Sequence, residues 1–203
     1  GGMQLKSFGA GGVYSPRFPD QYEKTDVFFG SMKFASGSVW KITPMVQWRR
    51  KKDHFMLYLN NPAYYENFHL TDAVGSQVTV TYSKKNYAAW TGLDVRYEHI
   101  YSNNIGKEMI PPKQVRGTDS AWYTRYYERT NYRLFHEEDF HLGKLGISAG
   151  IMMNWNSGFD GNPAIIPGMD ISYCASEKLT LFSGINRALH LPTFTDMFYV
   201  DPL

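Results

Sequence analysis

The chain has 203 residues, enough for one large domain or two small ones, and its 21 Lys and Arg side chains nearly balance 19 Asp and Glu. A formal net charge of +2 with scattered basic residues gives no electrostatic case for a nucleic-acid partner. The single cysteine excludes an internal disulfide framework, and a 16% aromatic content favours β-sheet.

The alternation of apolar and polar residues predicts an all-β chain of about nine strands. They are expected at residues 4–14, 26–35, 39–49, 73–82, 87–101, 119–135, 142–153, 165–175 and 178–189. Long loops are expected after residues 14, 49, 101 and 154, and short turns at 36, 83, 136 and 176. Such strict alternation is typical of an antiparallel up-and-down meander in a transmembrane β-barrel, whereas a Greek-key sandwich has no reason to show it.

The segment from Tyr87 to Tyr101 shows the strand pattern most clearly. Successive side chains of a strand point to opposite faces, so one face here is apolar and the other carries three charges. Ten residues at roughly 3.3 Å each, tilted by about 40°, rise roughly 25 Å, which is about the height of the lipid-facing band of a barrel. A soluble sandwich with the apolar face in its core would show the same alternation.

Two residues fit this pattern poorly. Pro44 lies in the middle of the predicted strand 39–49 and lacks the N–H that a central strand needs, so a bulge or kink is expected there. Glu128 lies on the apolar face of the segment 119–135, and we expect it to lie beyond the lipid band.

Six charged residues are expected to share the polar, lumen-facing side of the sheet: Asp94, Arg96, Glu98, Arg125, Arg129 and Arg133. On the lipid face, Arg or Lys would cost about 2–4 kcal/mol at mid-depth, so their confinement to one face is informative. They either pair with one another inside a barrel or contact an inner plug or a solute.

The sequence predicts no catalytic, cofactor or metal site, and no enzyme activity is expected. The run from His136 to His141 is not a His-Glu-x-x-His motif, and we expect a solvated acidic turn there. No Ser/His/Asp or Cys/His set is recognisable, and no run reaches the 18 or more apolar residues of a membrane helix.

The run from Leu179 to Tyr199 resembles a strand-to-loop element of TonB-dependent outer-membrane receptors, in particular the vitamin B12 and siderophore receptors. The residues that match the motif of this family are Asn186, Arg187, Pro192, Thr193, Phe194, Asp196 and Tyr199. His190 stands where the family usually has Arg, and Met197 where it has Leu. Residues 91–106, 130–135 and 146–150 resemble other strands of the family, so the resemblance covers roughly residues 24–203.

The resemblance implies a 22-stranded barrel in the bacterial outer membrane, closed around an N-terminal plug, that imports a scarce solute. The partners it implies are outer-membrane lipid, the chain's own plug domain, the TonB complex acting through that plug, and a small-molecule solute. Residues 1–203 would then be a section of the barrel, with the plug and the remaining strands absent. The opening Gly1-Gly2-Met3 also indicates a piece of a longer secreted chain.

Two alternatives remain open. The first is a soluble secreted β-sandwich that binds glycan or protein through aromatic loops such as Tyr64-Tyr65. The second, ranked last for want of a recognisable site, is a secreted β-rich hydrolase.

Overall fold

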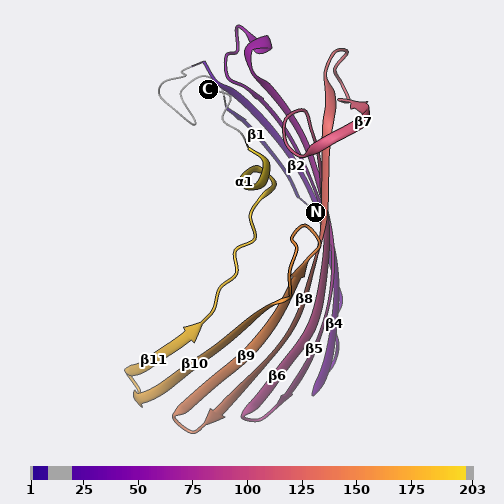
Figure 1. Ribbon diagram of the computed structural model, residues 1–203. Helices are drawn as coiled ribbons and strands as arrows, with labels where there is room; N and C mark the ends of the chain where they lie inside the picture. Colours follow the sequence, from indigo (N-terminus) through magenta and orange to yellow (C-terminus); the bar gives the residue numbers. More distant parts are fainter. Residues whose placement is uncertain (1, 9–19, 200–203) are drawn as a thin grey trace.

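The computed structural model describes residues 2–8 and 20–199. They form one curved antiparallel sheet, with a short helix on its concave side (Figure 1). The all-β prediction is therefore confirmed. The part of the predicted strand 4–14 that follows Phe8 lies outside the described residues.

The strands and helices are bounded as follows: β1 Gly2–Phe8, β2 Tyr22–Lys33, β3 Ser36–Gly37, β4 Trp40–Met56, η1 Pro62–Tyr64, β5 Glu66–Lys84, β6 Tyr87–Ser102, β7 Lys107–Gln114, β8 Trp122–Leu142, β9 Leu145–Asn156, β10 Ala164–Ser176, β11 Leu179–Asn186 and α1 Phe194–Phe198. Within the described ranges the sheet has 11 strands in the order β1-β2-β4-β5-β6-β8-β9-β10-β11, with β3 beside β4 and β7 beside β8. The main path is thus a nine-stranded meander, as the sequence predicts.

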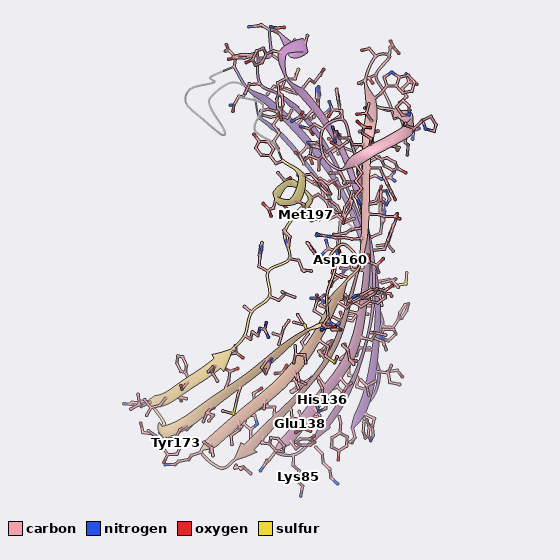
Figure 2. The ribbon with its side chains drawn as sticks, viewed as in Figure 1. Lys85, His136, Glu138, Asp160, Tyr173 and Met197 are labelled. Atoms are coloured by element: carbon pink, nitrogen blue, oxygen red, sulfur yellow. The ribbon has the colours of Figure 1, made fainter. Side chains whose placement is uncertain are left out.

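Tight turns join the strands at one end of the sheet, where Lys85 lies (Figure 2). The turn between β5 and β6 has Lys85 at φ 50°, and the turn between β8 and β9 has Gly143 at φ 63°. Positive φ values suit two-residue hairpin turns, because their backbone twist then matches that of the strands. The longer connections 57–65, 103–121 and 157–163 join the opposite ends of the strands.

The strands extend further than predicted at the long-loop end. β4 continues to Met56 and β5 begins at Glu66, so the loop predicted over residues 50–71 is wrong for most of its length. The loop predicted over 102–118 likewise contains β7. Backbone pairing is unbroken along the extension of β4 and β5, because antiparallel hydrogen bonds do not depend on an apolar face.

The acidic turn predicted at His136–Phe140 is wrong, because these residues belong to β8, which ends at Leu142. The Tyr87 hydroxyl on the neighbouring strand donates a 3.0 Å hydrogen bond to the Glu138 carboxylate. Cross-strand partners of this kind hold acidic side chains within a sheet, so the cluster of charge does not end the strand.

Pro44 interrupts a neighbouring strand and not its own. Its pairing with β5 continues without a register shift, so the bulge expected at this residue is not found. β2 instead ends at Lys33 and β3 begins at Ser36, which leaves the gap opposite Pro44, where no N–H is available. The Phe34 amide still donates to the Pro44 carbonyl at 3.0 Å, so the register is the same on both sides of the gap.

Large apolar side chains are exposed on the convex face of the sheet. Ile100 contacts α1 on the concave side, so residues an odd number away along β6, such as Leu93, point to the convex side. The side chains exposed there in the middle of the sheet include Ile42, Val46, Val78, Leu93, Leu134, Ile151, Met153, Met169 and Ile171. Cross-strand pairing places them side by side in one apolar band. Thr91, His136 and Glu138 interrupt it on β6 and β8, hydrogen-bonded to one another or to Tyr87.

Rows of aromatic side chains border this apolar band. Near the tight turns the row consists of Trp40, Tyr82, Tyr87, Phe140 and Tyr173, and at the other border it consists of Trp48, Tyr97, Tyr132 and Trp155. In the row near the tight turns, the ring centroids of Trp40 and Tyr82 are 4.7 Å apart, those of Tyr82 and Tyr87 5.9 Å, and those of Tyr87 and Phe140 4.8 Å. The eight residue-to-residue steps from Trp40 to Trp48 correspond to about 26 Å along the strand.

On the convex face, a row of charged side chains follows directly beyond the aromatic row of Trp48, Tyr97, Tyr132 and Trp155. Arg50 donates two hydrogen bonds, of 2.8 Å and 3.0 Å, to Asp72. Glu128 accepts hydrogen bonds from the hydroxyls of Tyr126 and Tyr97, which hold the pKa of its carboxyl below the ordinary value. Glu128 therefore lies outside the apolar band.

Buried apolar side chains form small clusters and not a central core. One contains Phe68, Val115 and Tyr123. The other contains Ile100 from β6, Ile105 from the connection between β6 and β7, and Phe194 from α1. In the described part of the chain no second sheet covers the first. The alternative of a two-layer sandwich is therefore wrong for these residues.

Gly92 provides a test of packing on the concave face. A Cβ atom there would lie 2.4 Å from the Phe135 ring and 2.9 Å from the Val78 carbonyl oxygen, whereas a Cβ at Gly30 would meet nothing within 4 Å. We expect Gly92→Ala to lower the free energy of unfolding by about 1–3 kcal/mol through overpacking, and Gly30→Ala to leave it nearly unchanged. Urea unfolding of the intact protein in detergent measures both, and an equal loss at Gly30 would contradict this account.

Candidate functional site

The six charged residues predicted to face a lumen all lie on two neighbouring strands. Asp94, Arg96 and Glu98 belong to β6, and Arg125, Arg129 and Arg133 belong to β8. The register places Asp94 opposite Arg133 and Glu98 opposite Arg129, and directly opposed residues project from the same face. This face is the one that carries Ile100 and α1, which is the concave side.

Most of these charges pair with one another. Arg133 Nη2 lies 3.0 Å from Asp94 Oδ1, and the Asp94 side chain is only 5% exposed. Arg129 Nε lies 2.5 Å from Glu98 Oε1, with both side chains largely buried. Arg125 instead donates a 3.0 Å hydrogen bond to the Gly106 carbonyl oxygen. A carboxylate that loses such a partner while buried is costly, so these pairs hold the register of β6 against β8.

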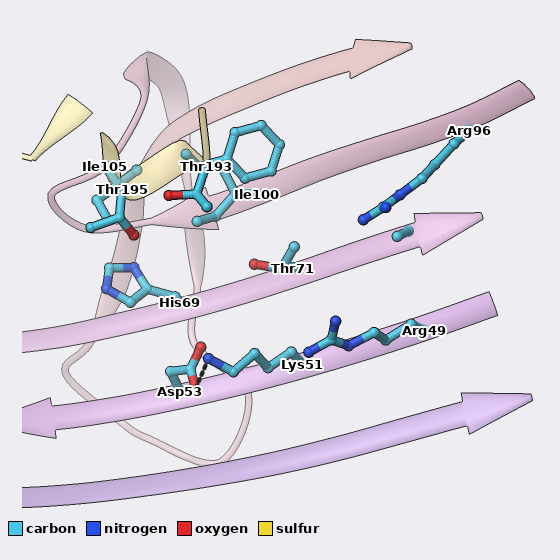
Figure 3. Close-up of a pocket in the computed structure, with 12 residues that line it drawn as sticks. Arg49, Lys51, Asp53, His69, Thr71, Arg96, Ile100, Ile105, Thr193 and Thr195 are labelled. Carbon is cyan, nitrogen blue, oxygen red and sulfur yellow. Dashed lines mark ion pairs between the residues drawn. The ribbon is translucent and has the colours of Figure 1, made fainter. Parts of the chain in front are cut away.

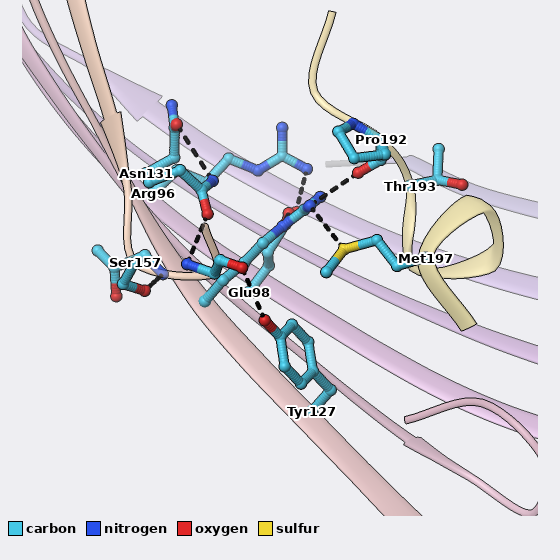
Figure 4. A network of polar contacts seen from close by, with 12 residues as sticks. Arg96, Glu98, Tyr127, Asn131, Ser157, Pro192, Thr193 and Met197 are labelled. Atoms are coloured by element: carbon cyan, nitrogen blue, oxygen red, sulfur yellow. Dashed lines mark hydrogen bonds and ion pairs between the residues drawn. The ribbon is translucent and has the colours of Figure 1, made fainter. Parts of the chain in front are cut away.

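Glu98 is shared between two arginines (Figure 4). Arg96 Nη2 lies 2.8 Å from its second oxygen, while Arg129 occupies the first. One carboxylate therefore faces two guanidinium groups, and the cluster of Arg96, Glu98 and Arg129 has a positive charge in excess.

Arg129 also holds the chain that follows β11 against the sheet (Figure 4). Its Nη1 atom donates to the Pro192 carbonyl oxygen at 2.7 Å and lies 3.6 Å from the Met197 sulfur. Its guanidinium lies over the Phe194 ring, 4.7 Å from the centroid. We name residues 187–199 the C-terminal segment, and Arg129 joins it to the barrel wall.

Local contacts shape the helix of the C-terminal segment. Thr193 and Asp196 form a capping box, in which the Thr193 amide and hydroxyl each donate to Asp196 Oδ2 at 2.8 Å. These hydrogen bonds hold the pKa of the Asp196 carboxyl below its ordinary value. Phe194, 7% exposed, packs against Ile100 and Ile105 on the concave wall. The capping box thus presents Phe194 to the sheet.

The remaining residues of the family motif lie at the two ends of the segment. Asn186 ends β11 and donates to Asp170 at 3.1 Å, and Arg187 donates to the Ile165 carbonyl oxygen at 2.8 Å. Tyr199 is the C-cap of α1, its ring exposed and its amide bonded to the Thr195 carbonyl oxygen. The motif therefore joins the end of one strand to an anchor on the opposite part of the wall.

A cavity of about 200 Å³ opens between the C-terminal segment and the concave wall (Figure 3). Three cationic side chains line it, Arg49 and Lys51 from β4 and Arg96 from β6. Lys51 Nζ lies 2.9 Å from Asp53 Oδ1, the one carboxylate among the lining residues. Sequence reasoning missed the β4 residues, because it ended the strand at residue 49. The sequence carried little signal for them, because Arg50 and Lys52 between them are also charged and the alternation of apolar and polar residues stops at Trp48.

His69 also lines the cavity, five residues beyond the level of Val74 and so outside the apolar band. Its Nδ1 atom lies 2.9 Å from the Ser102 hydroxyl. Burial lowers the pKa of the His69 imidazole to about 4, so the ring is neutral at pH 7.

The described residues contain no group of three or more His, Cys, Asp or Glu side chains that could hold a metal ion. In the same residues, no helix has the length and apolar character needed to cross a membrane.

Comparisons with known proteins give the fold. No protein-family model matches the chain, and no curated protein matches it. Two solved structures of the ferric enterobactin receptor PfeA from Pseudomonas aeruginosa, a single-substitution and a double-substitution variant, match with TM-scores of 0.59 at 13% and 12% identity. Each match covers 85% of this chain and 26% of the receptor, so the chain spans about a quarter of the length of these structures.

At this identity the likeness shows the fold alone. The prediction of an all-β antiparallel meander that forms part of a barrel is confirmed.

The role of Arg129 can be separated from that of its neighbour. We expect Arg129→Ala to release the C-terminal segment, because three of its contacts to that segment come from this one guanidinium. Amide hydrogen exchange of residues 193–198 should accelerate by about tenfold or more, the effect of losing roughly 1.4 kcal/mol of docking energy.

The matched control is Arg133→Ala, which also removes a concave-face arginine from a carboxylate but has no contact of this kind with the segment. It should lower overall stability without a selective acceleration of amide exchange at residues 193–198. Equal acceleration in both variants would contradict a special role for Arg129.

The ionisation of His69 predicts a pH dependence. The folded state favours the neutral ring, so its contribution to stability is complete above the unfolded pKa of about 6.5 and is lost as the pH falls toward 4. An NMR titration should place the imidazole midpoint near 4, and His69→Gln should remove this part of the acid destabilisation. A midpoint near 6.5 would show that the ring is solvated.

Proposed function

We propose that this chain is a section of the β-barrel wall of a TonB-dependent outer-membrane receptor, which imports a scarce solute such as vitamin B12 or a siderophore. The observation that supports this most is the exposed apolar band of the convex face, bordered by aromatic rows about 26 Å apart along the strands, which is about 20 Å in height for strands tilted by about 40°. A surface of this kind in water would drive aggregation, whereas in a bilayer it meets hydrocarbon.

The concave face fits the interior of such a barrel. Its polar side chains are either paired or directed to open space, as in a wet lumen. The chain's own plug domain would occupy this space in the intact protein. Because Asp94 and Arg133 already pair with each other, the side chains with positive charge left for plug or solute are chiefly Arg49 and the half-exposed Arg96, whose partner Glu98 is shared with Arg129.

The resemblance of residues 186–199 to the receptor motif adds a second line of support. Residues 1–203 would form one part of the barrel, and the plug and the other strands would belong to the rest of the intact protein. The barrel section would have no chemistry of its own, and energy would reach it from the TonB complex through the plug.

A charge placed on each face tests the assignment of the faces. Leu93 lies near the middle of the apolar band and is 45% exposed, while Thr79 lies opposite Gly92 on the concave face. In lipid vesicles we expect Leu93→Arg to lower the free energy of unfolding by about 2–4 kcal/mol, and Thr79→Arg to have a much smaller effect. Equal effects, or a greater loss at Thr79, would show that the convex face is not in lipid.

Uptake measurements test the transport role. Deletion of the gene should abolish saturable uptake of cobalamin or of a ferric siderophore, and dissipating the inner-membrane proton gradient should stop that uptake in the parent strain. Uptake of both solute classes that persists after deletion would contradict the proposal.

A further inference from the structure

The cavity beneath the C-terminal segment has an excess of positive charge. Arg49, Lys51 and Arg96 line it, and Asp53 is the one carboxylate among the lining residues. Lys51 pairs with Asp53, and Arg96 pairs with Glu98, which lies outside the lining and is shared with Arg129. Arg49 has no ion pair with a carboxylate of the described residues, so three lining cations stand against one lining carboxylate.

The other lining residues add hydroxyl groups and an apolar floor. Thr71, Thr193 and Thr195 contribute hydroxyls, and Ile100 and Phe194 contribute carbon surface. His69 is neutral at pH 7 and adds no charge. Such a cavity provides hydrogen-bond donors for negatively charged oxygens beside an apolar contact area.

We propose that this cavity is an oxyanion-binding site, taking the carboxylate or phosphate group of a solute or an acidic side chain of the plug. Guanidinium groups match such anions geometrically, because their forked N–H donors bind two oxygens together. An anion also offsets the mutual repulsion of Arg49 and Arg96, which point into one partly enclosed space (Figure 3).

The C-terminal segment forms one side of this site. Thr193 and Thr195 lie in the stretch that Arg129 fixes to the wall through Pro192. Anion binding and docking of the segment should therefore support each other, since both depend on the same short stretch of chain.

Binding of inorganic phosphate and of citrate to the intact protein in detergent tests the site by titration calorimetry at low salt. We expect Arg49→Gln to weaken binding by about tenfold, as the loss of one charge-assisted contact does. Rising salt should weaken binding in the parent protein.

Lys33→Gln is the matched control. Lys33 is an exposed cation of the same concave face, opposite Met45 and so about 13 Å along β4 from Arg49, outside the cavity. Its replacement should change the affinity less than twofold. Equal weakening in the two variants, or no binding of either anion by any form of the protein, would overturn the proposal.

The same binding measurement on a second form of the protein, in which the plug is deleted, identifies the source of the anion. This comparison rests on the proposed function, whereas the binding assay does not depend on transport. Binding by the intact protein assigns the site to a solute, and binding only after deletion assigns it to an acidic plug side chain. Both results support an oxyanion site, and a failure of uptake in the earlier test leaves either one standing.

Discussion

The structure depends on one constraint, the in-register antiparallel pairing of strands in a single layer. Because side chains alternate along each strand and opposed residues share a face, the pairing sorts the whole chain into two surfaces. Leu93 and Leu134 meet across β6 and β8 on the convex side, while their neighbours Asp94 and Arg133 meet on the other. A shift of one residue would exchange these surfaces completely. The ion pairs on the concave side oppose that shift, since each of their buried carboxylates would lose its arginine partner.

The alternation of side chains made the middle of the sheet predictable from the sequence. Strand β6 was expected at 87–101 and is found at Tyr87–Ser102, because its apolar and charged residues alternate without a break. Outside the apolar band the same reasoning was wrong. Residues 50–56 and 66–71 are polar or aromatic without a simple period, yet they pair as strands through their backbones. In the sequence, the acidic residues around Glu138 are typical of a turn. In the structure, the Tyr87 hydroxyl on the neighbouring strand donates a hydrogen bond to Glu138 and keeps it within the sheet.

The candidate site could be predicted only in part for a related reason. The sequence places Asp94, Arg96, Glu98 and Arg129 on one face, but it cannot show that Arg129 sits opposite Glu98. That pairing depends on register, and the contact of Arg129 with Pro192 joins residues 63 positions apart. Arg49 and Lys51 were overlooked because the predicted strand ended before the cavity began.

If the convex face meets lipid, as proposed above, the convex charged row of Arg50, Asp72 and Glu128 limits how deep the molecule can sit. It begins two residues beyond Trp48 on β4, about 7 Å along the strand. Sinking the molecule by that amount would carry an ion pair and a carboxylate into hydrocarbon, at a cost of several kcal/mol. Raising it would bring the opposite aromatic border out of the interfacial zone. On the proposed function, the row therefore sets the depth to which the wall enters the membrane.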